Sequence, residues 1–225
     1  MSDLLTLARW IKESRYTVAL TGAGMSTESG LPDFRSPSGW WHNIDPRTVA
    51  SVEALEADYP LFHQFYSARI RALADSKPHR GLLQGVATQN VDGFHQQANQ
   101  QRVHELHGSI RKVRCHSCER QADVESFLTG QACPACAGRL RPGVVLFGET
   151  LPEGAWSQAL TDLRSAELTV VVGTSLQVYP VAQLPSMTPG RVVMLNLERT
   201  EQDERFDLVL SGKAGELLQQ LNSLL

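Results

Sequence analysis

The alternation of apolar and polar positions predicts strands and helices that follow one another along the chain. Short apolar runs rich in β-branched residues are typical of strands, and apolar positions three or four apart are typical of helices. Because apolar strands alternate with helices, the pattern indicates an α/β fold with a parallel sheet covered by helices on both faces. The expected strands are 16–21, 86–90, 144–147, 168–172, 192–197 and 207–210, and the expected helices are 4–14, 60–73, 153–165 and 215–224.

Small or polar residues stand at the ends of four of these predicted strands. They are Gly22, Asn90, Thr174 and Asn196. The carboxyl ends of parallel strands share one edge of a sheet, and α/β proteins bind ligands outside that edge. The sequence therefore predicts a ligand site at this edge.

A glycine turn opens a long loop after the first predicted strand. Gly22-x-Gly24 would let the backbone approach a phosphate closely and leave amide donors free to face it. The full dinucleotide fingerprint needs a third glycine, where Thr27 stands. It also needs an acidic residue about twenty positions later, where a loop with two adjacent tryptophans lies. A standard dehydrogenase is therefore disfavoured, and a tight turn without a ligand stays an alternative. Residues 25–47 are expected to form a long ordered loop.

The four cysteines form two closely spaced pairs, Cys115-x2-Cys118 and Cys133-x2-Cys136, with 14 residues between the pairs. Two such knuckles place four thiolates on one tetrahedral zinc ion. Four protein ligands leave no open coordination position, so this zinc is expected to be structural. Free or disulfide-bonded cysteines are the alternative, and His116 is expected to be a solvated loop residue.

Composition and charge are those of an ordinary globular protein. Hydrophobic residues make up 42% of the chain, charged residues 20%, and the formal net charge is −3. This balance gives no electrostatic footprint for nucleic acid. The chain has no basic stretch leading into an apolar run at its start, and no apolar segment of about 18 residues. We expect a cytoplasmic protein that binds neither a membrane nor nucleic acid directly.

Five further motifs follow one another along the chain. They are Gly-Ala-Gly-Met-Ser-Thr-Glu-Ser-Gly-Leu-Pro-Asp-Phe-Arg at 22–35, Thr-Gln-Asn-Val-Asp at 88–92, His-Gly at 107–108, Gly-Thr-Ser-Leu-Gln-Val-Tyr-Pro at 173–180 and Asn-Leu-Glu at 196–198. Together with the cysteine pairs, this set resembles the signatures of the sirtuin family, whose members are NAD-dependent protein-lysine deacylases. The resemblance, to the bacterial type, spans about Trp10 to Leu221.

The resemblance implies two domains with a cleft between them. Residues 1–35, 80–110 and 144–225 would form a Rossmann-like NAD-binding domain. Residues 36–79 would form the cofactor loop and the helical part of a small domain, and residues 111–143 its zinc ribbon. NAD and an acylated lysine peptide would meet in the cleft, giving nicotinamide, free lysine and an O-acyl-ADP-ribose.

By resemblance, His107, Asn90 and Asp92 carry the catalysis. A histidine suits the removal of a proton from a ribose hydroxyl, because its ordinary pKa, near 6.5, lies close to working pH. Asn90 and Asp92 would orient the ribose, a water or the nicotinamide amide, with an Asx turn as the alternative. His104 is expected to be structural. The full set of expected cofactor contacts is Gly22, Ala23, Gly24, Glu28, Asp33, Phe34, Arg35, Gln89, Asn90, Asp92, Gly173, Thr174, Ser175, Asn196, Leu197, Glu198 and Ala214.

The acylated peptide is expected to bind by strand addition. The extended segments 145–149 and 177–179 would sandwich it through backbone hydrogen bonds. This arrangement tolerates many peptide sequences, because every peptide has the same backbone groups. The expected contacts are Val145, Phe147, Gly148, Glu149, Val178 and Tyr179.

Tyr66 and Arg69 leave open which acyl group the protein removes. They share one face of a predicted helix, and a Tyr-x-x-Arg pair in this region resembles sirtuins that remove succinyl or malonyl groups. A guanidinium binds a carboxylate through two hydrogen bonds. However, Thr27 and Asp33 stand where those enzymes usually carry Ala and Thr. We expect deacetylation first and desuccinylation second, with a packed tyrosine and a solvated arginine as the alternative.

Other functions stay open at this point. The chain could be a protein mono-ADP-ribosyltransferase, a non-catalytic NAD- or ADP-ribose-binding module, or a zinc-ribbon interaction protein. Zinc hydrolysis is disfavoured, because a fully cysteine-ligated ion has no water to activate. Compared with the family, the connections before Thr88 and at 186–190 are short, and the helix that leads into the 86–90 strand is expected to be truncated.

Overall fold

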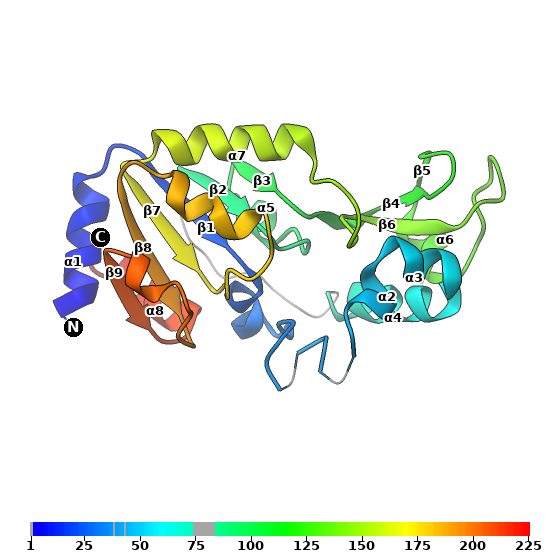
Figure 1. The fold of residues 1–225 in the computed structure, drawn as a ribbon, viewed down its shortest axis with the longest axis horizontal. Coiled ribbons are helices and arrows are strands. Elements are labelled where there is room, and N and C mark those ends of the chain that lie inside the picture. The colour runs from blue at the N-terminus through cyan, green and yellow to red at the C-terminus, as the bar shows by residue number, and fades with distance from the viewer. Residues whose placement is uncertain (1, 38, 43, 74–83) are drawn as a thin grey trace.

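The computed structural model describes residues 2–37, 39–42, 44–73 and 84–225. Its larger sheet has six parallel strands in the order β3-β2-β1-β7-β8-β9 (Figure 1). The strands are β1 (Thr17–Thr21), β2 (Gly85–Thr88), β3 (Val103–Glu105), β7 (Leu168–Val172), β8 (Arg191–Asn196) and β9 (Leu208–Ser211). Strand order runs outward in both directions from the neighbours β1 and β7. A sheet of this topology has its ligand crevice where these two strands end.

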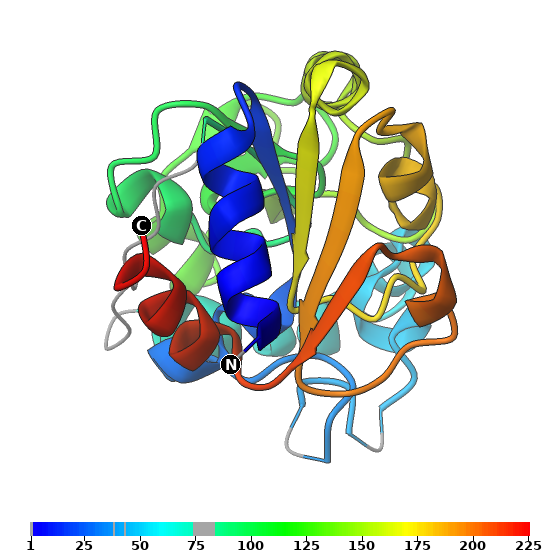
Figure 2. The same cartoon turned by 90° about the vertical axis from the view of Figure 1, so that its left-hand side faces the viewer.

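Helices cover both faces of this sheet, as the alternating pattern predicts. One face packs on α1 (Ser2–Glu13) and α8 (Ala214–Asn222), and Figure 2 shows α1 lying along this face. The opposite face packs on α7 (Glu153–Ser165) and the 3-10 helix η3 (Val181–Met187). Side chains of β7 alternate between the two cores, because successive residues of a strand point to opposite faces.

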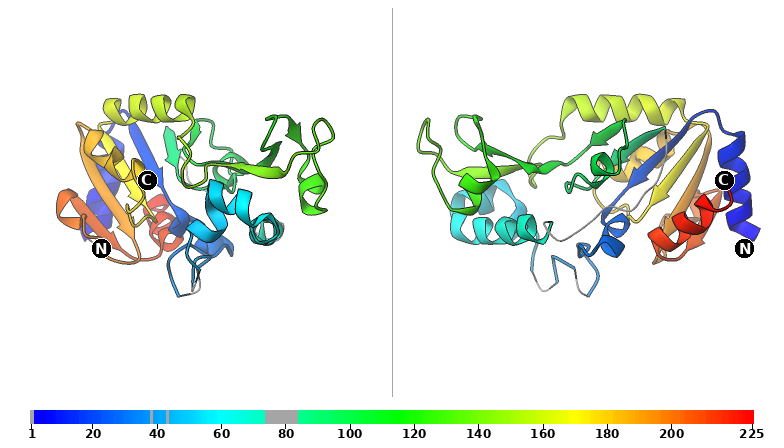
Figure 3. Two further views of the ribbon diagram at one scale, coloured as in Figure 1. Left: turned by 45° about the vertical axis from the view of Figure 1, so that its right-hand side comes forward. Right: turned by 180° about the vertical axis from the view of Figure 1, so that it is seen from behind.

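A smaller antiparallel sheet, β5-β4-β6, stands beside the large one. Helices pack on it around a core of their own, and Figure 3 shows this unit at the end of the molecule away from both termini. Its elements are β4 (Gly108–Cys115), β5 (Gln121–Ala122), β6 (Leu140–Val144), α2 (Arg47–Ala50), α3 (Val52–Ala57), α4 (Tyr59–Ala72) and α6 (Val124–Leu128). The remaining short helices are η1 (Ala23–Met25), η2 (Thr27–Ser29), α5 (Phe94–Gln97) and η4 (Asp203–Arg205).

The predicted fold class is confirmed: a Rossmann-like parallel sheet with helices on both faces, and a small unit that holds the four cysteines. The prediction of a strand at 144–147 is wrong. β6 ends at Val144, and beyond it Phe147 makes only an isolated bridge with Ser51. The amides of Val145 and Phe147 donate to carbonyls of loop and helix residues rather than to a neighbouring strand.

The short connection predicted before Thr88 falls largely within residues 74–83, outside the described residues. The connection at 186–190 runs from the end of η3 into β8. Within the described ranges, no helix is long and apolar enough to cross a membrane.

Candidate active site

A cleft of about 380 Å³ lies at the carboxyl edge of the large sheet and extends to the small unit. The expected cofactor and peptide contacts that border it are Gly22, Ala23, Gly24, Asp33, Phe34, Arg35, Tyr66, Arg69, Gln89, Asn90, His107, Val145, Phe147, Gly148, Glu149, Gly173, Thr174, Ser175, Val178, Tyr179, Asn196, Leu197, Glu198 and Ala214. Segments distant in sequence therefore meet in one cleft. The cleft lies at the edge of the sheet that the residues at the strand ends predict.

Two of the expected cofactor contacts lie outside the lining of the cleft. The Glu28 carboxylate accepts a hydrogen bond from the Gly215 amide in the first turn of α8, where the helix dipole favours negative charge. Asp92 instead borders a smaller pocket that adjoins the cleft, since Phe34 and Asn90 border both. Glu28 therefore joins the cofactor loop to α8, next to the cleft residues Thr27 and Ala214.

The glycines of the two strand-end turns allow these turns to touch. The Gly22 amide donates to the Val172 carbonyl at 3.0 Å, and the Gly24 amide donates to the Gly173 carbonyl at 2.8 Å. A Cβ on Gly22 would stand 2.6 Å from Thr174, and one on Gly173 would stand 2.4 Å from the backbone of the facing turn. The amides of Gly22 and Gly24 are therefore not free for a phosphate, because they donate to β7 and to the turn that follows it.

A buried polar network lies beside the first turn. The Asn90 side-chain amide donates to the Gly22 carbonyl at 3.0 Å and to the Ser26 hydroxyl at 3.1 Å. That hydroxyl donates to Asp92 at 2.8 Å, and the second Asp92 oxygen accepts from the Phe94 amide at 2.9 Å. The Asx turn considered for this segment is thus present at Asp92, together with a contact to the cofactor loop.

His107 ends the connection from β3 to β4 and faces the cleft. Its Nδ1 lies 3.1 Å from the Gln89 carbonyl. A carbonyl only accepts, so Nδ1 carries the proton and the Nε2 lone pair is free. Burial lowers the pKa of His107, and the hydrogen bond to Gln89 only partly opposes this. The ring is therefore a neutral base at neutral pH.

Gln89 connects His107 to the turn after β7. Its side-chain amide donates to the Thr174 hydroxyl at 2.9 Å, and that hydroxyl accepts from the Leu176 amide at 3.2 Å. The ends of β2 and β7 and the ring of His107 therefore form one hydrogen-bonded unit, which holds the base in a defined orientation.

Aromatic rings connect the cofactor loop to the small unit. The Phe34 and Trp41 ring centroids are 4.7 Å apart, and those of Trp41 and Phe147 are 6.0 Å apart. The Arg35 guanidinium lies 4.8 Å from the centroid of Trp41. Burial lowers the pKa of Arg35, and Asp33 opposes this effect. These contacts confirm that much of the loop is ordered by packing.

Tyr66 and Arg69 border the cleft from one face of α4. Tyr66 is buried, which raises the pKa of its phenol. The Arg69 guanidinium lies 4.9 Å from the centroid of Phe34 and 5.5 Å from that of Tyr66. Burial lowers the pKa of Arg69, and no carboxylate among the described residues forms an ion pair with it. Arg69 is therefore packed against aromatic rings while keeping part of its surface exposed at the cleft.

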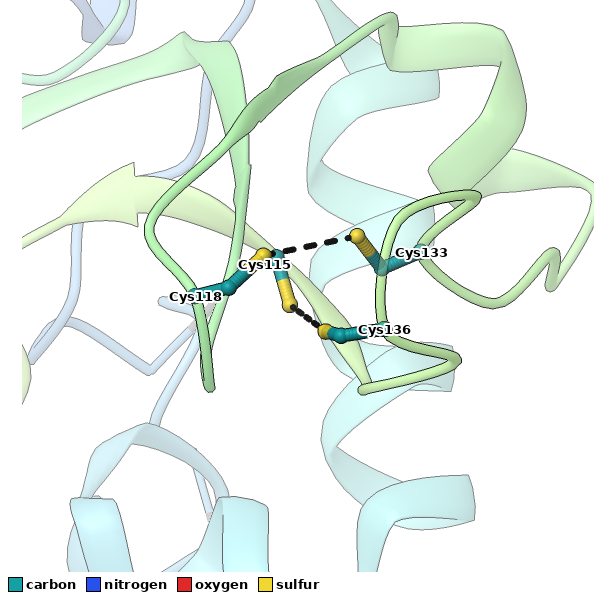
Figure 4. A group of neighbouring side chains, drawn as sticks. All are labelled: Cys115, Cys118, Cys133 and Cys136. Atoms are coloured by element: carbon teal, nitrogen blue, oxygen red, sulfur yellow. Dashed lines mark hydrogen bonds between the residues drawn. The ribbon is translucent and has the colours of Figure 1, made fainter.

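The four cysteine sulfurs come together at the end of the small sheet (Figure 4). All four Sγ atoms lie within 4.8 Å of one another, and the shortest pairs are Cys115 with Cys136 at 3.4 Å and Cys118 with Cys133 at 3.7 Å. Four thiolates at this spacing fit one tetrahedral zinc ion with every position filled by protein. None of them borders the cleft, so this metal would hold structure together rather than take part in the reaction.

The geometry of this site can be compared with known proteins. The model of the Sir2 family matches residues 22–180. The chain belongs to the Sir2 family. It is 46% identical over 234 residues to NAD-dependent protein deacetylase 1 of Geobacillus kaustophilus, covering 97% of each protein. It is 38% identical over 236 residues to an NAD-dependent protein deacylase of Thermococcus sibiricus, covering 95% of this chain and 92% of that protein.

The fold also matches solved Sir2 proteins. A Sir2 variant in complex with a deacetylated p53 peptide and 3′-O-acetyl ADP ribose superposes with a TM-score of 0.92 and 32% identity, covering 98% of both chains. The resemblance to the sirtuin family noted in the sequence is thus confirmed.

Ser26 and Trp41 are among the residues of this Sir2 site that the sequence predictions left out. Ser26 links Asn90 to Asp92, and Trp41 stands between Phe34 and Phe147. Ser26 lies inside the 22–35 motif, so its position was a usable signal. Nothing in the local pattern distinguishes Trp41 from its neighbour Trp40, because the two differ only in which rings they contact.

The His107 geometry predicts a particular pH dependence. Desolvation disfavours the imidazolium, so the neutral base persists as pH falls, and the acidic limb of kcat/KM should lie below the ordinary histidine pKa of about 6.5. His107→Ala should lower turnover at pH 7 by about 10²- to 10⁴-fold. The matched control is His104→Gln, because His104 pairs with Asp162 away from the cleft. An acidic limb above the ordinary value, or one that moves in the control, would contradict this assignment.

The cysteine cluster predicts one zinc ion per chain. Cys136→Ser should lose most of this zinc, measured by elemental mass spectrometry, because three thiolates bind less tightly than four. Its melting temperature should fall, since each kcal/mol lost lowers Tm by about 2–4 °C in a chain of this size. Ser117→Ala, within the first knuckle, should keep the metal. A wild-type protein that is fully stable without zinc would refute the prediction.

Proposed function

We propose that this chain removes acyl groups from protein lysines with NAD as co-substrate, acetyl first. The products would be nicotinamide, the free lysine and an O-acyl-ADP-ribose. The observation that carries the proposal is the His107 ring, held with a bare Nε2 in a cleft at the carboxyl edge of a parallel sheet. The class of enzyme follows from membership of the Sir2 family, since the chain is an NAD-dependent protein deacetylase.

Each step of this reaction can be assigned to residues that the structure brings to the cleft or next to it. NAD supplies a sugar carbon that the acyl oxygen captures when nicotinamide leaves. His107 would then take the proton of a ribose hydroxyl on Nε2, since Nδ1 is committed to Gln89. The hydroxyl oxygen would bond to the captured acyl carbon, and one water molecule would be consumed as the bond from that carbon to the lysine nitrogen breaks. Phe34, packed on Trp41 at the border of the cleft, shields the sugar carbon from water. Asn90 and Asp92 orient the ribose and the nicotinamide amide.

Two walls of the cleft suit an extended peptide. Residues 145–148 and 177–179 approach it from the small unit and from the loop after β7. The Val145 amide is committed to the His107 carbonyl and the Phe147 amide to the Ala50 carbonyl, which holds this wall in an extended form. An acylated peptide adds as a strand between the walls. A related Sir2 variant has been solved with a deacetylated p53 peptide, which supports a peptide as the ligand.

The domain boundaries and a cytoplasmic location stay predictions. So does the second acyl preference. Arg69 supports desuccinylation or demalonylation, because it places a cation among aromatic rings beside the cleft, with no ion pair to a carboxylate among the described residues. A distal carboxylate would complete the missing pair through two hydrogen bonds. Acetyl removal needs no such partner, so the two activities are compatible.

A panel of acyl peptides tests the main proposal. Acetyl, propionyl, malonyl and succinyl peptides are incubated with and without NAD, and both products are weighed by mass spectrometry. We expect acyl loss that depends on NAD and releases one nicotinamide per free lysine. A peptide that gains ADP-ribose would instead indicate a mono-ADP-ribosyltransferase. NAD binding without release of nicotinamide would indicate a non-catalytic module.

Arg69→Met tests the acyl preference. A hydrogen bond to a charged group contributes about 1.5–3 kcal/mol, so kcat/KM for the succinyl peptide should fall by about 10- to 100-fold. Turnover of the acetyl peptide should stay close to that of the wild type. Arg71→Met is the matched control, since Arg71 is exposed on the same helix. Equal losses on both peptides would reject a carboxylate-reading role for Arg69.

A further inference from the structure

An ion pair between a buried arginine and a partly exposed glutamate lies beside the peptide wall formed by residues 145–148, and Arg114 approaches the same carboxylate at 3.7 Å. Arg141, on β6, is fully buried, and its guanidinium donates to both Glu149 oxygens, at 2.6 and 2.8 Å. The same guanidinium donates to the Val144 carbonyl at 2.7 Å. The Arg141 side chain therefore forms hydrogen bonds with Val144 and Glu149, the residues that flank this wall on either side.

Glu149 completes the contact from the other side. Its carboxylate also accepts from the Leu146 amide at 2.8 Å, and the Glu149 amide donates to the Leu146 carbonyl at 3.0 Å. Burial alone would raise the pKa of Glu149, but the hydrogen bonds from Arg141 and Leu146 lower it overall. The carboxylate expected to meet the substrate is thus occupied within the protein.

Burial of this pair is not explained by stability alone. Replacing a buried ion pair by apolar side chains of similar volume is often neutral or stabilising. A bidentate arginine–carboxylate pair, however, fixes geometry more strictly than apolar contacts do. Here the geometry that it fixes is the backbone of Leu146 and Val144, which border the cleft.

We propose that Arg141 and Glu149 are positioning residues that set the backbone of residues 145–148 to receive the acylated peptide. The inference rests on the proposed deacylase function. Neither side chain needs to touch the peptide. Together they hold one side of the wall, and the carbonyls of His107 and Ala50 hold the other. Without the pair, residues 145–148 would become ordered only when the peptide binds. The entropy lost in that ordering would weaken binding of the peptide but not binding of NAD.

Steady-state kinetics of Arg141→Met and Glu149→Gln test the proposal. We expect the KM for the acetyl peptide to rise about tenfold, equivalent to about 1.4 kcal/mol. The KM for NAD and kcat should stay within about twofold of wild type. A purely structural role would act differently, because partial unfolding reduces kcat and leaves the KM of the folded molecules unchanged. Arg141→Lys, which keeps the charge but loses the parallel hydrogen bonds, should be intermediate.

A second measurement does not depend on turnover. Amide hydrogen exchange of residues 145–149 in the free protein should be faster in both variants, because Arg141→Met no longer fixes the Glu149 carboxylate that accepts from the Leu146 amide, and Glu149→Gln replaces it by a weaker, neutral acceptor. Arg15→Met is the matched control, since it breaks an exposed pair far from the wall, in which two guanidinium nitrogens contact one Glu167 oxygen. That control should change neither the exchange of the wall nor the KM for the peptide.

The outcomes separate this inference from the proposed function. An unchanged KM for the peptide in folded Glu149→Gln, or an equal rise in the KM for NAD, would overturn the positioning role. If Arg141→Met fails to fold, Glu149→Gln decides, since it keeps the side-chain volume. A wild-type protein that turns over no acyl peptide would instead refute the proposed function, and the exchange data would still report whether the pair holds the wall.

Discussion

The contact between the turns that follow β1 and β7 is the constraint on which the cleft depends. In a parallel sheet whose strand order runs outward from these two neighbours, both turns reach the same edge and must cross closely. Gly22 and Gly173 permit this, since a Cβ on either would collide with the opposite turn. Hydrogen bonds through Gln89 then tie the ring of His107 to the same crossing. The position of the base is thus set by backbone contacts that no larger residue would tolerate.

The small antiparallel sheet extends this order from the cysteines to the base. β4 starts at Gly108, directly after His107, and ends at Cys115, the first of the four cysteines. Its partner β6 places Leu140 opposite Cys115 and Val144 opposite Gly108. Both the catalytic ring and the wall of the peptide cleft therefore continue from strands whose far end is fixed by the cysteine cluster. A structural metal can in this way support a reaction centre without bordering it.

Periodicity and strand-end residues were enough to predict the sheet, its covering helices and the edge that holds the cleft. The prediction failed where contacts distant in sequence decide the local structure. The apolar run at 144–147 reads as a strand, but its amides pair with His107, Ala50 and Glu149 instead. β3 was missed because its three residues include a buried histidine that is satisfied by Asp162 on α7. That α8 offers an amide to Glu28 likewise follows from the fold and not from the local sequence.

Arg69 and Arg141 show why the chemistry of a buried arginine cannot be read from sequence. Both lie near the same cleft, and both have lost most of their hydration. Arg141 has a carboxylate and a carbonyl within hydrogen-bonding distance. Its donors are therefore used to hold the backbone of the wall and are not available to a ligand. Among the described residues, Arg69 has aromatic faces around it and the Asp92 charge nearby, but no carboxylate in an ion pair with it. The difference between a positioning arginine and one available to a ligand therefore lies in the partner, and the fold alone supplies or withholds that partner.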